Sequence, residues 1–178
     1  MTRRPDCADG PSGSPVSAAG FSIRPAREAD VGAVLRMIRA LAEFERLSHL
    51  VVATEADLQA ALFGPRPAAE VLIAWDGATP AGFALFFHNF STFLGRRGLW
   101  LEDLWVEPAH RRRGCAQALL RRLAAIAVER DCGRFEWVVL DWNAAAIDFY
   151  RSLGATVLPD WRIVRVVGAE LDALAGAR

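Results

Sequence analysis

Residues 99–120 read LWLEDLWVEPAHRRRGCAQALL. An apolar run with bulky side chains ends at Pro108, three arginines follow, and Gly114, Cys115 and Ala116 lead into a segment rich in alanine and leucine. A short apolar run that stops at a proline predicts a strand, and leucines at helical spacing predict a helix. The stretch therefore predicts a strand, a turn and a helix in direct succession.

The turn between this strand and this helix combines positive charge with small side chains. The first N–H groups of a helix lack intrahelical acceptors and lie at the positive end of its dipole, so they attract phosphate oxygens. Small residues let a diphosphate approach the backbone, and Arg111, Arg112 and Arg113 add attraction for it. A solvated basic turn is the plainer interpretation of an arginine run. Because neither GxxxxGKS/T nor GxGxxG occurs in the sequence, a phosphate site here belongs to another class.

The flanking sequence continues to alternate between the patterns of strands and helices. The N-caps are expected at Asp30, Thr54 and Asn143, and two helices are expected to end at Gly64 and Gly154. Predicted strands cover residues 21–26, 69–76, 81–90, 98–107, 134–142 and 161–167, and predicted helices cover residues 27–47, 54–64, 115–130, 144–154 and 169–177. This order predicts an α/β domain with a mixed sheet and helices on both faces.

Length and composition limit the class of protein. The 178 residues, 53% of them hydrophobic, suffice for one domain with a core, and residues 1–20, rich in Gly, Pro, Ser and Ala, predict a flexible tail before a domain of residues 21–178. A formal net charge of zero argues against a protein that coats nucleic acid or a membrane. Three unpatterned cysteines favour a reducing cytoplasm and predict no metal site. Neither a secretory signal nor an apolar run of membrane-spanning length is found in the sequence.

Two longer segments carry a resemblance to a known family. Arg111, Gly114 and Ala116 match the R/Q-x-x-G-x-G/A signature of the GNAT superfamily of N-acetyltransferases. LEDLWVEPAHRRRGCAQALL and LDWNAAAIDFYRSLGA resemble the two signature segments of its diamine (spermidine/spermine) acetyltransferase branch, while VVLDWN and FSTFLGRRG are more similar to the thialysine-acetylating members. The resemblance covers residues 21–168. It implies the GNAT fold, a mixed and mostly antiparallel sheet with a splayed slot for acetyl-CoA.

The resemblance also implies how acetyl-CoA is bound. Leu104, Trp105 and Val106 would offer a free strand edge to the amides of the pantetheine arm. The backbone amides of residues 112–117, ending at Gln117, would bind the diphosphate. The apolar side chains of this strand would suit any core strand, so they add no evidence by themselves.

The family pattern places a tyrosine and an asparagine near the thioester. Tyr150, the only tyrosine in the chain, matches the residue that protonates the leaving thiolate, although it would also suit packing beside Phe149. Asn143 would offer its carboxamide near the pantetheine arm, although it also suits an N-cap. Cys115 lies in the predicted diphosphate turn, so the amine is expected to attack acetyl-CoA directly in a ternary complex, without an acyl-cysteine.

Two adjacent acids interrupt the strand that leads to the turn. An alkylammonium has a pKa of about 10.4, so an enzyme that acetylates amines has to remove a proton or select the neutral amine. Glu102 matches the branch's acid that accepts this proton. In a regular strand Asp103 would point to the opposite face, whereas a bulge would bring both carboxylates to one face.

The resemblance implies a small cationic substrate, such as a diamine, thialysine or a lysine-like amine. Ser91 replaces an acid of the polyamine-specific members, which favours the shorter substrates. Acetylation of a protein N-terminus or lysine, and a non-catalytic acetyl-CoA-binding regulatory module, are the alternatives. Related proteins form homodimers, so a homodimer is expected. The candidate substrate-binding residues are Glu45, Phe93, Asp103, Asp160 and Trp161.

Overall fold

The computed structural model describes residues 16–18 and 20–176. Residues 1–15, most of the predicted tail, lie outside the described residues. The chain divides into two compact units, residues up to Val138 and Val139–Arg178. The prediction of one domain for residues 21–178 stays a prediction.

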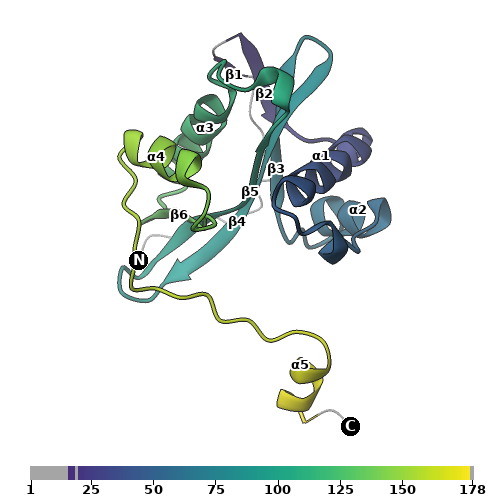
Figure 1. The fold of residues 1–178 in the computed structure, drawn as a ribbon, viewed down its shortest axis with the longest axis vertical. Coiled ribbons are helices and arrows are strands. Elements are labelled where there is room, and N and C mark those ends of the chain that lie inside the picture. Colours follow the sequence, from purple (N-terminus) through teal and green to yellow (C-terminus); the bar gives the residue numbers. More distant parts are fainter. Residues whose placement is uncertain (1–15, 19, 177–178) are drawn as a thin grey trace, which may run out of the picture. The chain divides into compact units, whose positions relative to one another are not determined.

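The first unit is built on a six-stranded sheet whose strands follow one another in chain order (Figure 1). Every neighbouring pair is antiparallel except β5 and β6, which run parallel, and this confirms the predicted mixed, mostly antiparallel sheet. Because β1 pairs with β2, the sheet begins before the boundary predicted at Phe21. The strands are β1 (Val16–Ala18), β2 (Phe21–Pro25), β3 (Glu70–Asp76), β4 (Thr79–Ser91), β5 (Arg96–Val106) and β6 (Phe135–Trp137).

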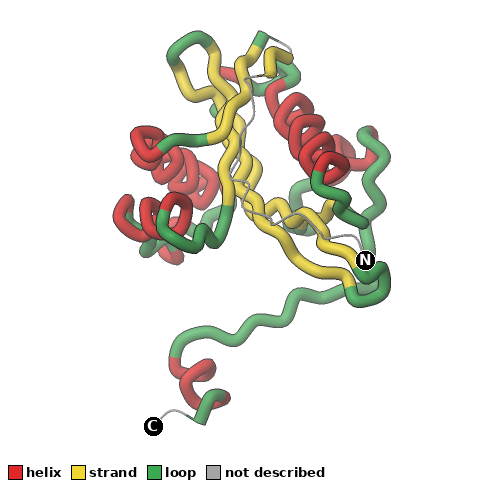
Figure 2. Tube along the Cα trace, turned by 180° about the vertical axis from the view of Figure 1, so that it is seen from behind, coloured by secondary structure: helices red, strands yellow, loops and turns green. Residues whose placement is uncertain are grey.

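Helices cover both faces of this sheet, as predicted. Helices α1 (Val31–Phe44) and α2 (Glu55–Phe63) lie on one face and α3 (Cys115–Glu129) on the other (Figures 1 and 2). The core beneath α1 and α2 contains fully buried apolar side chains from helix and sheet, among them Val34, Ile73 and Phe83. Short 3-10 turns precede α1, α2 and α3, at Glu28–Asp30, Ser48–Leu50 and Pro108–His110.

The predicted N-caps differ in how they act. Thr54 forms the predicted capping box, because its hydroxyl accepts from the N–H of Asp57 at 3.2 Å while the Asp57 carboxylate accepts from the N–H of Thr54 at 2.9 Å. Asp30 occupies the N-cap position of α1, but its carboxylate accepts from the guanidinium of Arg24 at 2.7 Å and from the N–H of Arg27 at 2.8 Å. The Asp30 carboxylate therefore fixes the turn before α1.

The second unit contains α4 (Ala144–Ser152) and α5 (Ala169–Leu174). Asn143 caps α4 as predicted, since its Oδ1 accepts from the N–H of Ala146 at 3.2 Å. The strand predicted over residues 161–167 is wrong, because these residues form no strand in the structure. The alternation of apolar residues was present, but a strand also needs a neighbour to pair with its backbone.

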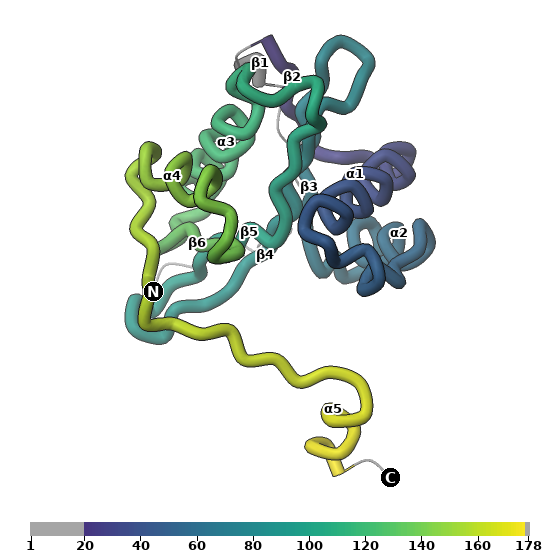
Figure 3. The backbone as a smooth tube through the Cα atoms, in the orientation of Figure 1, coloured from purple at the N-terminus to yellow at the C-terminus, as the bar shows by residue number. Residues whose placement is uncertain are grey.

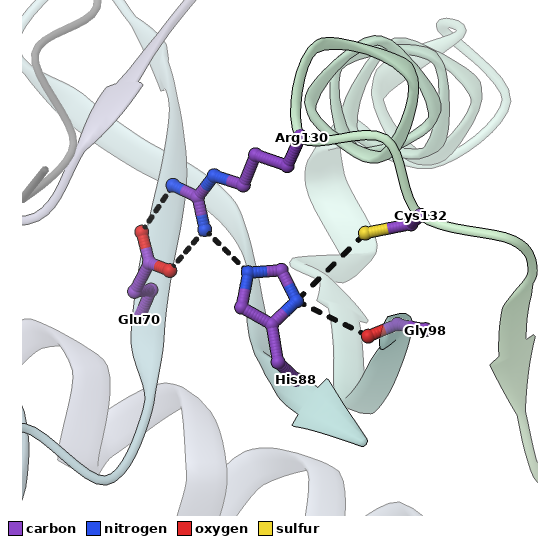
Figure 4. Close-up of polar contacts among 5 residues, drawn as sticks. All are labelled: Glu70, His88, Gly98, Arg130 and Cys132. Atoms are coloured by element: carbon purple, nitrogen blue, oxygen red, sulfur yellow. Dashed lines mark hydrogen bonds and ion pairs between the residues drawn. The ribbon is translucent and has the colours of Figure 1, made fainter. Parts of the chain in front are cut away.

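A polar network joins strands β3, β4 and β5 to the end of α3 (Figure 4). Arg130, which follows α3, donates through both terminal nitrogens to the carboxylate of Glu70 and lies 3.0 Å from Nε2 of His88. Nδ1 of His88 lies 3.1 Å from the carbonyl oxygen of Gly98 and 3.8 Å from Sγ of Cys132. Because the guanidinium only donates and the carbonyl only accepts, His88 carries its proton on Nδ1. The network ties β3, β4 and β5 to the helix.

Replacing Arg130 by methionine is expected to lower the free energy of unfolding by about 1–3 kcal/mol, because the half-buried acceptors of Glu70 and His88 lose their donor. Urea unfolding measures the change. Arg122→Met, two turns earlier on α3, is the matched control, since Arg122 pairs with the exposed Glu129 and its loss is expected to cost less than about 1 kcal/mol. Equal losses in the two variants would contradict a stabilising role for the network.

Candidate active site

One edge of β5 lacks a neighbouring strand over its last five residues. β6 pairs with β5 only from Leu99 to Leu101, whereas β4 pairs with β5 on its other side as far as Val106, opposite Gly82 (Figure 3). Outward-facing N–H and C=O groups of residues 102–106 therefore have no strand partner among the described residues. This open edge coincides with the predicted slot, and an extended chain of amides can pair with it as another strand would.

The backbone at the start of α3 is shaped by one glycine. Gly114 is the N-cap of α3 and has φ +81°, a left-handed conformation that costs a residue with a Cβ about 1–2 kcal/mol. No side-chain cap occupies the first N–H groups of α3, although the helix begins at the buried Cys115. These free donors and the small side chains beside them fit a diphosphate.

The three arginines of the turn differ in their contacts. Arg113 pairs with Asp76 at 2.8 Å, and Nε2 of His110 lies 3.4 Å from the same carboxylate. Arg112 has φ +59°, is exposed, and makes no hydrogen bond or ion pair within the described part of the chain. Arg113 thus anchors the turn to the end of β3, while Arg112 is the arginine that stays available to an anion.

Arg111 points to the α1 side of β5. Its Nε donates to the carbonyl oxygen of Val106 at 3.0 Å, and its guanidinium carbon lies 4.6 Å from the ring centroid of Trp105 and 5.3 Å from that of Phe44. Cation–π contacts of this kind hold the planar guanidinium in one orientation. Arg111 therefore lines a surface hollow of about 310 Å³, called the Arg111 hollow, with Ala40, Glu43, Phe44, Trp105, Glu107 and Pro108.

A β-bulge interrupts the regular pairing of β5 at the two adjacent acids. Asp103 pairs with Leu85, whereas Leu101 pairs with the next residue of β4, Phe86, so that Glu102 is the extra residue of the bulge. Leu85 and Phe86 face opposite sides of the sheet, so Asp103 and Leu101 do as well. In a regular strand these two β5 residues would share a face. The bulge therefore reverses the alternation at Glu102.

The bulge brings both carboxylates to the face that α1 covers. Oε2 of Glu102 accepts from Nε1 of Trp100 at 2.9 Å, and the Trp100 ring packs against Phe87, which shares a sheet face with Leu85, the partner of Asp103. The sequence left open whether the two acids lie on one face or on two. The register of β4 and β5 shows that both acids lie on one face of the sheet.

Burial perturbs the acids on this face. It raises the pKa of Asp103 to about 6, with smaller contributions from the negative charges of Glu102 and Glu45. Burial also raises the pKa of Glu45, which directly follows α1. We call Glu45, Glu102 and Asp103 the acidic group. Glu45 and Asp103 are half-buried and Glu102 is exposed, and a cation that binds among the three carboxylates stabilises their charged forms.

The other predicted substrate-binding and catalytic residues belong to the β4–β5 turn and to the second unit. Phe93, 96% exposed, lies in the turn between β4 and β5, and with a rise of about 3.3 Å per residue it is roughly 20 Å or more along the strand from Asp103. Within one chain, Phe93 is therefore not beside the acidic group. Asn143, Tyr150, Asp160 and Trp161 belong to the second unit, where the Tyr150 ring lies 5.5 Å from that of Phe149 on α4 and Trp161 is exposed.

Sequence reasoning missed the part of the Arg111 hollow that α1 contributes. Glu43 and Phe44 read as ordinary residues at the end of an amphipathic helix, and no local pattern marks them. Only the packing of α1 over β5 places them beside Trp105, where the rings of Phe44 and Trp105 lie 5.9 Å apart.

Within the described residues, no helix is both long and apolar enough to cross a membrane.

Comparison with known proteins identifies relatives along most of the chain. The model of the acetyltransferase (GNAT) family matches residues 35–155. The chain is 33% identical to L-ornithine N5-acetyltransferase NATA1 of Arabidopsis thaliana, over 97% of this chain and 96% of that protein. It is 37% identical to the thialysine N-epsilon-acetyltransferase of Sus scrofa, over 89% of this chain and 99% of that protein.

Solved structures share the fold at lower sequence identity. An integron cassette protein from the mobile metagenome of V. cholerae superimposes with a TM-score of 0.74 at 24% identity, over 88% of this chain and 98% of that one. This similarity supports the architecture only.

Proposed function

The chain belongs to the GNAT acetyltransferase family and is an N-acetyltransferase, and we propose that it moves the acetyl group of acetyl-CoA to a primary amine of a small cationic substrate. The observation that carries the proposal is the acidic group, two of whose members, Glu102 and Asp103, lie on β5 where its open edge begins. Carboxylates attract an alkylammonium and can accept its proton. Relatives named for ornithine and thialysine support an acceptor of this class.

In this proposal acetyl-CoA lies along β5 and ends at the start of α3. The outward-facing backbone groups of the segment formed by Leu104, Trp105 and Val106 pair with the pantetheine amides, apart from the carbonyl oxygen of Val106, which accepts from Nε of Arg111. The amides of residues 112–117 bind the diphosphate with help from Arg112. The open strand edge, the left-handed Gly114 and the uncapped start of α3 support this placement. The carboxamide of Asn143 is proposed to lie near the pantetheine arm while it caps α4.

Replacing Gly114 by alanine is expected to raise the KM for acetyl-CoA about tenfold or more, because a Cβ strains the left-handed backbone and projects toward the bound diphosphate. Initial rates at varied acetyl-CoA measure the effect. Gly77→Ala is the matched control, since Gly77 also has a positive φ, of 58°, but lies in the β3–β4 turn outside the proposed site. A KM that changes equally in both variants would contradict a diphosphate at Gly114.

The proposed chemistry is direct attack in a ternary complex. The amine nitrogen forms a bond to the acetyl carbon, the carbon–sulfur bond breaks, Glu102 accepts the proton of the amine through ordered water, and Tyr150 protonates the leaving thiolate. Burial raises the pKa of the Cys115 thiol to about 11, so at neutral pH Cys115 is a protonated and poor nucleophile. This supports transfer without an acyl-cysteine.

A panel assay tests the proposed function. The purified chain of 178 residues is mixed with acetyl-CoA and with ornithine, thialysine, putrescine, spermidine or a peptide with a free N-terminus, and thiol release and acetylated product are both measured. We expect release with the small amines. Release with the peptide alone would instead assign the chain to protein acetylation, and coenzyme A binding without any release would assign it to a regulatory module.

We also propose that the protein acts in the cytoplasm as a homodimer. The two described cysteines, Cys115 and Cys132, are free thiols, which suits a reducing compartment. The exposed apolar side chains of Trp161, Ile163 and Val164 support contact with a second copy. Sedimentation equilibrium distinguishes a dimer from a monomer.

A further inference from the structure

Trp100 is a half-buried aromatic residue next to the acidic group on β5. Its indole Nε1 donates to Oε2 of Glu102 at 2.9 Å, and its ring centroid lies 6.5 Å from that of Phe87 on β4. An indole has a single N–H group, which donates and cannot accept. The bond to Glu102 therefore uses the one polar atom of this side chain, while the contact with Phe87 restricts the ring.

The bulge leaves Glu102 with few other restraints. Glu102 has no partner residue on β4, and its side chain is exposed, so no side chain lies directly opposite to hold it in place. No second hydrogen bond or ion pair to its carboxylate occurs within the described residues. A free glutamate side chain has several rotamers, and the bond to Trp100 reduces their number before a substrate binds.

We propose that Trp100 is a positioning residue, whose indole N–H holds the Glu102 carboxylate in the orientation in which it accepts the proton of the amine. Oε2 is bonded to Trp100, and Oε1 keeps its acceptor sites for the ordered water that passes on this proton. A base that is already oriented needs no rearrangement during the reaction, which favours proton transfer. The inference rests on the proposed role of Glu102 and adds a residue outside the acidic group to the site.

A purely structural role for Trp100 predicts different results. If the ring only packs against Phe87, its N–H is dispensable, and a smaller ring would disturb both acids of β5 alike. If the N–H orients Glu102, its loss impairs proton transfer to Glu102 and spares the binding of acetyl-CoA. It also spares Asp103, whose carboxylate makes no hydrogen bond within the described residues.

Trp100→Phe removes the N–H and keeps an aromatic ring beside Phe87. We expect kcat to fall about tenfold, in line with the loss of a hydrogen bond to a charged group, and the KM for acetyl-CoA to change less than about twofold. Steady-state rates measure both, with the one of ornithine, thialysine and putrescine that is acetylated fastest as the acceptor.

Trp75→Phe is the matched control. Trp75 is half-buried on β3, and its Nε1 makes no hydrogen bond within the described residues. Phenylalanine can still pack against the guanidinium of Arg24, which lies 4.4 Å from the centroid of the Trp75 ring. The same loss of an indole N–H is therefore expected to change kcat less than about twofold.

Two further backgrounds separate the orientation of Glu102 from packing. In Glu102→Gln the group that Trp100 positions no longer accepts a proton, so adding Trp100→Phe is expected to lower kcat no further. In Asp103→Asn, adding Trp100→Phe is expected to lower kcat by about tenfold again. A fall of similar size in the wild-type, Glu102→Gln and Asp103→Asn backgrounds would overturn the inference, because Trp100 would then act through packing.

The outcomes also separate this inference from the proposed function. Glu102→Gln at the wild-type rate would overturn the proposed base and the inference with it. An impaired Glu102→Gln beside a Trp100→Phe enzyme at the wild-type rate would overturn the inference alone. If Trp100→Phe does not fold, benzothienylalanine at position 100, which has the shape of tryptophan with sulfur in place of the N–H group, takes its place with the same expected results.

Discussion

Replacing Tyr150 by phenylalanine is expected to lower kcat by about 10²- to 10⁴-fold, the usual contribution of a general acid or base. The thiolate of coenzyme A leaves as the carbon–sulfur bond breaks, and the phenol is the group proposed to protonate it. Phenylalanine keeps the ring and its packing beside Phe149, so the variant removes the hydroxyl group and retains the aromatic contact. Steady-state rates at saturating acetyl-CoA and amine measure the loss.

Phe149→Leu provides the control for this variant. It removes an aromatic ring from the same helix without removing a proton donor, and kcat is expected to fall by less than about tenfold. A Tyr150→Phe enzyme that works at the wild-type rate would show that the thiolate leaves without help from this tyrosine.

Replacing Asp103 by asparagine is expected to stabilise the fold of the free enzyme and to lower its catalytic activity. The pKa of Asp103 is raised from 3.8 to about 6, so its ionisation above pH 6 costs the native state about 2–3 kcal/mol. Asparagine has the same shape and no charge to bury. We therefore expect the free energy of unfolding at pH 8 to rise by about this amount, while kcat/KM for the amine falls about tenfold or more because the cation loses a carboxylate.

The pH dependence of this gain in the free energy of unfolding follows from the direction in which the pKa of Asp103 is shifted. A raised native pKa means that the folded state binds the proton more tightly than the unfolded state does, so the wild-type enzyme loses stability as the pH rises from about 4 to about 6. The difference between variant and wild type should be near zero below pH 4 and complete above pH 6. Asp131→Asn, at an exposed ion pair with Arg96, should show no comparable gain. A gain for Asp103→Asn that is independent of pH would contradict the raised pKa.

Local signals predicted the elements that depend on neighbours in sequence. The capping box at Thr54, the cap at Asn143 and the turn at Gly114 each need only a few consecutive residues, and the structure has all three. The strand predicted over residues 161–167 depends instead on a partner strand, which its own pattern does not specify. The strand predicted over residues 134–142 is shorter in the structure, at Phe135–Trp137.

The geometry of the candidate site depends on long-range pairing. Sequence alone shows that Glu102 and Asp103 are adjacent, but it does not show on which face of the sheet each side chain lies. The bulge that decides this is defined by the register against Leu85 and Phe86. Likewise, nothing local indicates that the end of α1 meets β5 beside Arg111. The motif identified which residues carry the chemistry, and the tertiary fold decides which of them meet.

A crystal structure of the 178-residue chain with coenzyme A and ornithine tests the acceptor site most directly. We expect the distal amine within hydrogen-bonding distance of the Asp103 or Glu102 carboxylate, and the diphosphate on the backbone amides of residues 112–117. An amine bound away from both carboxylates, or a diphosphate that does not touch the start of α3, would contradict the account.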